Sequence, residues 1–212
     1  MSGIEVRGLA LGALDTNCWL VSDGIGGPLV VIDPAGDAEE LLAAIADCAV
    51  GAVVLTHGHF DHLGAASRLI AETGAPFAVS VRDAASVTDA VANGGMLFGF
   101  DDVAPEPQRL LAEGDLVEAG QVRLRVLGTP GHTPGSICLM AEAAGQTHLF
   151  SGDTLFAGSV GRTDFPGGDA RAMRESIARL ASLPGETLVH PGHGPDTTLA
   201  REARVNFFWP RA

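Results

Sequence analysis

The sequence predicts an α/β protein folded as a four-layer α/β/β/α sandwich. Short apolar runs typical of buried strands are interspersed with segments of helical apolar spacing, and this succession occurs twice along the 212 residues. Several of the apolar runs end in a Gly- or Ser-rich turn that carries His or Asp. We therefore expect one domain over residues 1–212, built from two similar halves at about 1–108 and 109–212, with strands in the middle and helices outside both sheets.

The first half contains patterns for strands, helices and one long loop. An Asp-x-x-Glu capping box at Asp37–Glu40 predicts a helix that runs to about Cys48. A second helical pattern starts at His62 and ends at Gly74, and a third lies near 82–91. The segment 93–108 is rich in Gly, Pro and acidic residues and is expected to be a connecting loop. The expected strands lie near Ile4–Leu9, Trp19–Ser22, Leu29–Ile32, Ala52–Leu55 and Phe77–Ser80.

The second half repeats this organisation. A helix is expected to start at Asp169, because Met173, Ile177 and Leu180 fall on one face. A last helix is expected near 197–205. The expected strands lie near Gln121–Leu127, Ser136–Ala141, Thr147–Phe150 and Thr187–His190.

The strongest chemical signal is the turn Thr56–His62, which reads Thr-His-Gly-His-Phe-Asp-His. It links an expected strand to an expected helix. His57 and His59 are two residues apart, so on extended backbone they face the same side and can hold one ion as a pair. Asp61 and His62 lie further round the turn, which suits a second ion close to the first. Buried polar groups without partners are costly, so a metal site explains this cluster better than chance packing does.

Three later turns each present one further ligand-type residue at the end of an apolar strand. His132 lies in the segment Thr129–Ser136, Asp153 follows Ser151-Gly152, and His193 follows Pro191-Gly192. Loops on a rigid scaffold often carry catalytic groups. Together with the Thr56–His62 turn, these positions predict a two-metal centre.

These seven positions resemble the metallo-β-lactamase superfamily, whose mark is His-x-His-x-Asp-His followed by later His, Asp and His ligands. The resemblance implies the metallo-β-lactamase fold and two divalent ions, with zinc expected first and iron or manganese as alternatives. It further implies that Asp61 and Asp153 orient the attacking hydroxide as well as bind metal. The implied ligands are His57, His59 and His132 for one ion, Asp61, His62 and His193 for the other, and Asp153 as the bridge.

Four segments more closely resemble short glyoxalase II-like hydrolases, which cleave S-acyl thioesters of glutathione such as S-lactoylglutathione. They are 131–136, 151–156, 161–165 and 191–195. The expected function is therefore hydrolysis of a small thioester by a metal-activated hydroxide. The C-terminal glutathione-binding helical domain of full-length glyoxalase II is not expected here. The alternatives are a mononuclear iron persulfide dioxygenase, which segment 161–165 also resembles, and a hydrolase of another ester, lactone or lactam.

Several other residues are candidates for supporting roles. Arg162 could bind a substrate carboxylate or form an ion pair with Asp164, and both readings stay open. Asp33 is a candidate for structural support of the site. His148 and His190 are expected to pack or hydrogen-bond rather than bind metal. The aromatic residues Phe207, Phe208 and Trp209 are expected to cover the core.

Composition narrows the classes of partner. The net charge of −13 argues against nucleic acid, and every basic residue is arginine. No window resembles a membrane span, and the first residues lack the pattern of a signal peptide, so a cytoplasmic protein is expected. The three cysteines, Cys18, Cys48 and Cys138, are expected to be buried free thiols. The expected partner is a small-molecule thioester, and the oligomeric state stays open.

Overall fold

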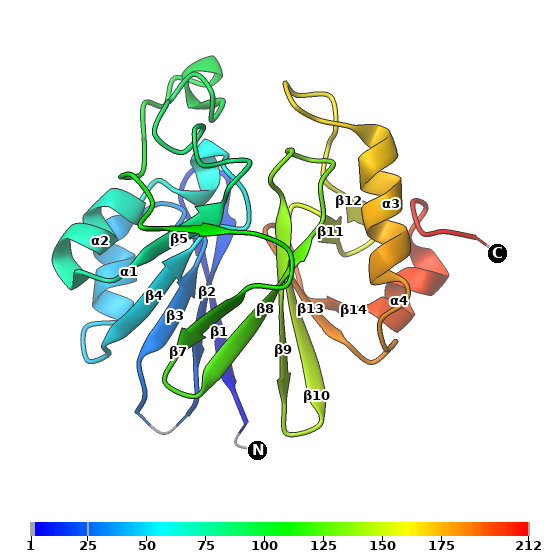
Figure 1. Cartoon of the computed structure of the whole chain (residues 1–212), viewed down its shortest axis with the longest axis horizontal. Coiled ribbons are helices and arrows are strands. Elements are labelled where there is room, and N and C mark those ends of the chain that lie inside the picture. Colours follow the sequence, from blue (N-terminus) through cyan, green and yellow to red (C-terminus); the bar gives the residue numbers. More distant parts are fainter. Residues whose placement is uncertain (1–2, 25, 212) are drawn as a thin grey trace.

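A computed structural model, which describes residues 3–24 and 26–211, contains two six-stranded sheets packed face to face (Figure 1). Helices α1 and α2 cover the outer face of one sheet, and α3 and α4 cover the outer face of the other (Figure 1). The layer order is α/β/β/α, which confirms the predicted fold class.

The first sheet has the strand order β1-β2-β3-β4-β5-β6. The first three strands are antiparallel, whereas β3 to β6 run parallel. Because the carboxyl ends of parallel strands meet at one edge, the loops after β3, β4 and β5 gather there. The strands span Glu5–Leu11, Thr16–Ser22, Leu29–Ile32, Val50–Val54, Phe77–Ser80 and Arg109–Leu111. The helices α1, η1, α2 and η2 span Ala38–Ala44, Phe60–His62, Ala66–Thr73 and Gly95–Leu97.

The second sheet has the strand order β14-β13-β10-β9-β8-β7, and only β10 and β13 pair in parallel. A short hairpin, β11–β12, follows β10. The strands β7 to β14 span Leu116–Ala119, Val122–Gly128, Ile137–Ala143, Gln146–Gly152, Leu155–Phe156, Ser159–Val160, Leu188–Pro191 and Thr197–Thr198. The helices α3 and α4 span Ala170–Leu180 and Leu199–Val205.

Three apolar clusters fill the three spaces between the four layers. Alternation along β4 shows how the sequence builds them, because Ala52 and Val54 face the opposite sheet whereas Val53 faces α1 and α2. The middle cluster joins the two sheets, with Phe150 of the second sheet packed among strands of both. The third cluster packs Met173 and Ile177 of α3 on the outer face of the second sheet. This packing fixes the position of one sheet relative to the other, and with it the loops at their shared edge.

Two local predictions about helices in the first half are wrong. Asp37 does precede α1, but its backbone is left-handed (φ 46°) and its carboxylate accepts a hydrogen bond from Gly12 N (2.7 Å) instead of capping its own helix. The segment 82–91 forms successive turns rather than a helix. Its Ser and Asp side chains bond to nearby backbone, as Ser86 Oγ does to Asp83 O (2.7 Å), and such bonds compete with helical ones.

Three side-chain predictions also need correction. Cys48 follows α1 at the surface and is exposed, whereas Cys18 and Cys138 are buried as expected. Phe207 and Phe208 are exposed, at 78% and 49% of their surface, because the chain beyond α4 turns only Trp209 back onto the third cluster.

The strands β6 and β7 were not expected, and both are short pieces of three and four residues. None of the helices among the described residues is long and apolar enough to cross a membrane.

Candidate metal centre

The turn Thr56–His62 lies after β4, at the edge where the two sheets meet. His57 and His62 are fully buried there, and their rings approach to 4.2 Å between centroids. His132 contacts the same cluster, with its ring centroid 4.7 Å from that of His57. It comes from the loop between β8 and β9 in the other half. The turn from the first half therefore meets a loop of the second half.

All seven side chains that the sequence singled out come together in three overlapping groups. The potential ligand atoms within each group lie within 4.8 Å of one another. We call the trio of histidines the first group and the trio containing Asp61 the second group; the third trio links them. The first group is His57, His59 and His132; the second is Asp61, His62 and His193; the linking trio is His57, His62 and Asp153.

Asp153 lies between the first and second groups. Its Oδ2 is 3.5 Å from His132 Nε2 of the first group and 3.7 Å from His193 Nε2 of the second. Its Oδ1 is 3.2 Å from His62 Nε2. The carboxylate of Asp153 therefore faces histidines of both groups.

The donor set fits divalent metal. Three buried atoms, His57 Nε2, His62 Nε2 and Asp153 Oδ1, face the cluster with no hydrogen-bond partner among the described residues. Buried polar atoms are normally satisfied, and a bound cation would satisfy these. Imidazole and carboxylate donors suit zinc, iron or manganese.

The remaining nitrogens of these histidines are occupied, which orients the rings. His62 Nδ1 lies 2.9 Å from Asp33 Oδ2, and His132 Nδ1 donates to the carbonyl of Arg162 at 2.8 Å. His57 Nδ1 lies 3.1 Å from Thr56 Oγ1. In each ring the Nε2 atom is then left to face the cluster, as in metal-ligating histidines whose second nitrogen is held.

The two groups differ in charge. Burial, together with the neighbouring histidines, holds the pKa of His57 well below its usual range and lowers the pKa of His59 to about 4, so both are neutral at pH 7. Burial also opposes charge on His62, but the surrounding carboxylates outweigh it and raise the pKa of His62. For Asp61 and Asp153 burial opposes ionisation, and the histidines, His62 foremost, outweigh it and lower the pKa of each. His57 and His59 of the first group thus disfavour a proton, whereas the carboxylates of Asp61 and Asp153 raise the pKa of His62 and His193 beside them.

Asp33 supports the second group by holding the ring of His62, as the sequence suggested. Its carboxylate accepts hydrogen bonds from Thr56 N and Thr56 Oγ1, both at 2.7 Å, as well as facing His62. Asp33 itself is 1% exposed and follows β3 directly. A residue at the end of β3 thus fixes the start of the Thr56–His62 turn, which follows the neighbouring parallel strand β4.

Asp83 supports the first group, and sequence reasoning missed it. Its Oδ2 accepts from Gly58 N (2.9 Å) and Thr133 Oγ1 (2.6 Å), while its Oδ1 accepts from Gly135 N (2.8 Å). One buried carboxylate therefore ties the Thr56–His62 turn to the loop that carries His132. The only signal in the sequence was its place just after the strand Phe77–Ser80.

Asn17 holds the loop that carries His193, and it too was missed. Its backbone N donates to Gly192 O (2.7 Å), and its side-chain amide donates to Pro191 O (3.0 Å) and Gly194 O (2.8 Å). Trp19 Nε1 donates to Pro191 O as well, at 3.1 Å. Residues of β2 in the first half thus hold the His193 loop of the second half through hydrogen bonds.

Glycines allow the loops to pack this closely. A Cβ atom on Gly192 would overlap Asp153 Oδ1 and lie 2.7 Å from His62 Cε1. A Cβ atom on Gly161 would overlap the carbonyl oxygen of Asp153. Neither position has room for any side chain.

A cavity of about 470 Å³ opens onto the two groups. Aromatic rings from both halves form much of its wall, and Arg162 lies on its rim side. Arg162 forms a bidentate ion pair with Asp164, at 2.7 and 2.8 Å. Both predicted roles of Arg162 are therefore compatible with its position, because it lines the cavity and is also ion-paired. His148 and His190 lie 3.0 Å apart, Nδ1 to Nε2, and belong to none of the ligand groups.

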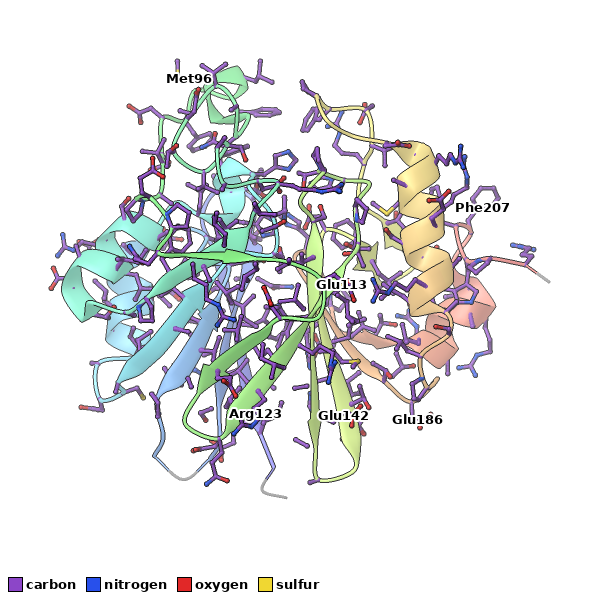
Figure 2. The ribbon with its side chains drawn as sticks, viewed as in Figure 1. Met96, Glu113, Arg123, Glu142, Glu186 and Phe207 are labelled. Carbon is purple, nitrogen blue, oxygen red and sulfur yellow. The ribbon has the colours of Figure 1, made fainter. Side chains whose placement is uncertain are left out.

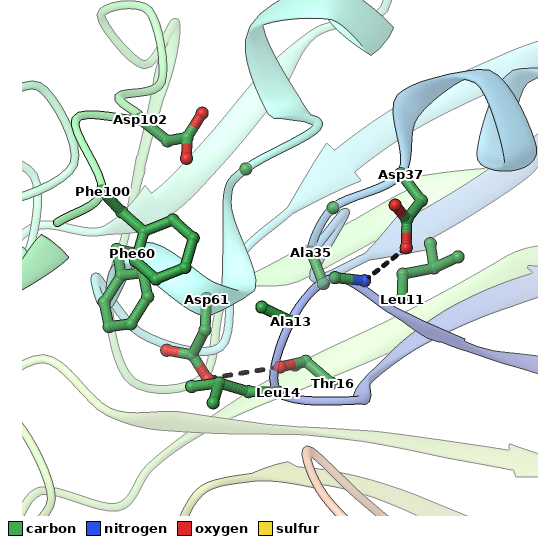
Figure 3. A pocket seen from close by; sticks show the side chains of 13 residues that line it. Leu11, Ala13, Leu14, Thr16, Ala35, Asp37, Phe60, Asp61, Phe100 and Asp102 are labelled. Atoms are coloured by element: carbon green, nitrogen blue, oxygen red, sulfur yellow. Dashed lines mark hydrogen bonds between the residues drawn. The ribbon is translucent and has the colours of Figure 1, made fainter. Parts of the chain in front are cut away.

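A second cavity, of about 260 Å³, is also lined by Asp61 (Figure 3). Thr16 Oγ1 donates to Asp61 Oδ2 across 3.3 Å there, and the rings of Phe60 and Phe100 stack at its wall (Figure 3). Asp61, Phe60 and Leu14 line both cavities. Asp61 therefore lines both cavities and is held by a residue of β2.

An α/β/β/α sandwich that gathers histidine and aspartate from both halves at one edge defines a protein of a metal-binding class. The chain belongs to the metallo-beta-lactamase superfamily, whose family model matches residues 11–193. Among its relatives, an uncharacterized protein from Aquifex aeolicus is 38% identical and covers 96% of each chain. The hydroxyacylglutathione hydrolase GloC from Haemophilus influenzae is 34% identical and covers 92% of this chain and 93% of its own.

Solved structures with the same fold carry different names. The B3 metallo-beta-lactamase BLEG-1 has a TM-score of 0.89 and 33% identity, covering 96% of this chain and 99% of that one. TTHA1623, solved in a di-iron-bound form, has a TM-score of 0.77 and 37% identity over 96% of this chain and all of its own. ETHE1 from Myxococcus xanthus has a TM-score of 0.74 and 32% identity, covering 96% and 83%. These likenesses agree on the fold, but the names of these proteins do not point to one reaction.

Proposed function

We propose that this protein hydrolyses a small S-acyl thioester of the S-lactoylglutathione type at a two-metal centre. One observation carries the proposal: the second group is complete, with Asp61, His62 and His193 converging beside an equally complete first group. A mononuclear enzyme would need only one of these groups. The similarity to GloC, a hydroxyacylglutathione hydrolase by name, supports the same reaction.

The chain's own residues would divide the work. His57, His59 and His132 would hold one ion, Asp61, His62 and His193 the other, and Asp153 would bridge them. When bound, two such ions act as Lewis acids and make hydroxide available at neutral pH. Asp61 and Asp153, both ionised because the histidines lower their pKa, would accept hydrogen bonds from the attacking water and orient it. The leaving thiolate is stable, so no general acid is required.

Arg162 would act at the rim of the cavity. Its guanidinium is exposed and could exchange Asp164 for a substrate carboxylate, since exposed ion pairs contribute only about 0–1 kcal/mol. The role is separate from that of the seven ligand positions.

A mononuclear iron persulfide dioxygenase is the second candidate, supported by the 32% identity to ETHE1 and by the segment 161–165. It would rely on the His57, His132 and Asp153 positions and would consume oxygen. The two reactions therefore differ in metal count and in co-substrate.

Metal analysis followed by activity assays tests the proposal. The purified protein should contain about two divalent ions per chain and should release thiol from S-lactoylglutathione or a related ester without taking up oxygen. The His193→Ala variant should lose one ion and most turnover. The matched control, His148→Ala, changes a histidine outside the ligand groups and should keep both ions.

Other outcomes point elsewhere. One iron per chain, with oxygen uptake on glutathione persulfide, would identify the dioxygenase. Two ions with turnover of a lactone or cephalosporin, but of no thioester, would keep the hydrolase class and reject the substrate.

A further inference from the structure

Four phenylalanines form a continuous row, and three of them, Phe60, Phe98 and Phe165, line the cavity beside the ligand groups. We call Phe100, Phe60, Phe98 and Phe165 the aromatic row. Phe60 stacks on Phe100 with centroids 5.1 Å apart and on Phe98 at 5.5 Å, and Phe98 contacts Phe165 at 6.1 Å. Phe165 in turn lies 6.0 Å from His59 of the first group. The row therefore starts beside the ligand groups and joins segments from both halves.

Phe98 is the exposed member of the row and lies beside other exposed apolar side chains. Phe98 leaves 54% of its surface uncovered, whereas Phe60 behind it is 8% exposed. Met96 and Leu97, next to Phe98 on the same 3-10 turn, are 55% and 69% exposed, and Met96 lies at the tip of the first half's loop (Figure 2). Leu14 lines the cavity from the β1–β2 turn and is 51% exposed. Contiguous apolar surface of this kind, beside a reactive centre, marks a binding surface.

Charge at the rim is already balanced. Arg162 is the only Lys or Arg among the described residues lining this cavity, and the chain contains no lysine. Its guanidinium lies 3.7 Å from the centroid of the Phe165 ring and binds Asp164 through two hydrogen bonds. An anionic substrate arm would have to displace Asp164, within a protein whose net charge is −13. An uncharged arm would meet no such competition.

We propose that the aromatic row binds the thiol arm of the substrate, and that this arm is apolar and carries no carboxylate. The inference rests on the proposed thioester hydrolysis and narrows its substrate: the preferred carrier is an uncharged apolar thiol rather than an anionic peptide thiol such as glutathione. The small acyl group stays beside the ligand groups, while the thiol arm lies outward along Phe165 and Phe98. The thiolate then leaves toward solvent.

A matched set of esters tests this order of preference. Acetyl thioesters of 2-phenylethanethiol, N-acetylcysteamine and glutathione share one acyl group, and all three leave as alkyl thiolates. The value of kcat/KM should be highest for the phenylethyl ester and at least about tenfold lower for the glutathione ester, given the apolar area that one ring buries. A glutathione ester that is hydrolysed as efficiently as the phenylethyl ester would overturn the inference.

Variants locate the preference on the row. Phe98→Ala should lower kcat/KM about tenfold for the phenylethyl ester and less than twofold for the glutathione ester. Phe207→Ala, which changes an exposed ring beyond α4, should affect neither ester. Asp164→Asn should raise kcat/KM for the glutathione ester alone, because it frees Arg162. Equal losses for both esters in Phe98→Ala would show that the ring has only a structural role.

Binding of inert thioethers separates this inference from the proposed function. Ethyl phenylethyl sulfide and S-ethylglutathione cannot be hydrolysed, and calorimetry measures their affinity directly. If no thioester turns over, the proposed function fails. Tighter binding of the apolar thioether, lost in Phe98→Ala, would still support the row as its site, whereas equal or tighter binding of S-ethylglutathione would reject it.

Discussion

The first and second ligand groups are adjacent and share one turn, yet they differ in charge. The first is built from imidazoles alone, and burial lowers the pKa of His57 and His59, so that these two are neutral ligands at pH 7. The second contains Asp61, and the carboxylates around His62 raise the pKa of that histidine. One turn of seven residues thus supplies two histidines that stay neutral and one histidine whose protonated form the neighbouring carboxylates favour. The difference arises from the neighbours each half brings to the turn.

The supports of the two groups run in the same direction, from the first half of the chain to loops of the second half. Asp83 of the first half holds the His132 loop of the second half for the first group. Asn17 of β2 holds the His193 loop for the second group. Each group therefore combines ligands from both halves, so metal binding and the docking of the halves are coupled.

The largest effect is expected from removing a ligand that belongs to the first group only. His59→Ala should lower metal content and reduce turnover on the order of 1000-fold, because one ion loses a third of its ligand trio. Emission spectroscopy of the purified variant and initial-rate assays measure both quantities. Full activity in this variant would refute the assignment of the first group.

Removing a supporting carboxylate should come next, and it should act on stability. Asp83→Ala leaves two buried backbone N–H groups and one hydroxyl without their acceptor, which should lower the free energy of unfolding by about 3 kcal/mol. Urea denaturation in the presence of a chelator measures this without metal. The exposed Asp164→Ala serves as control and should cost less than about 1 kcal/mol. Equal costs would mean that Asp83 does not tie the two halves together.

The smallest effect separates the groups most clearly. Asn17→Ala removes two side-chain hydrogen bonds to the His193 loop and should weaken metal binding at the second group by about 10-fold to 100-fold. Affinity at the first group should change less than about twofold, since no bond from Asn17 reaches it among the described residues. Stepwise competition with a chromophoric chelator resolves the two affinities. A matching loss at both would show that the loops respond as one unit.

The sequence predicted the fold class and brought the seven ligand-type residues to attention, because both depend on local patterns. Strand alternation and Gly-rich turns are written in consecutive residues, and so is the His-Gly-His-Phe-Asp-His turn. Asp83 and Asn17 were missed because their partners are about 50 and 175 positions away, beyond any local spacing rule. The segment 82–91 has helical composition, yet its Ser and Asp side chains bond to backbone or to distant loops instead. The extent of the single domain and the metal roles of the seven residues stay predictions.

The glycines beside Asp153 have a consequence for how this protein can change. Gly192 and Gly161 admit no side chain, so variation at these two positions is blocked by contact with Asp153 itself. Phe98 and Leu14, by contrast, are about half exposed and lie on segments that carry no ligand. Random libraries restricted to such rim positions should retain metal in most clones and diversify the compounds accepted. Positions that contact Asp153 thus tolerate no substitution, whereas exposed positions that line the cavity can vary. Directed evolution can use this division.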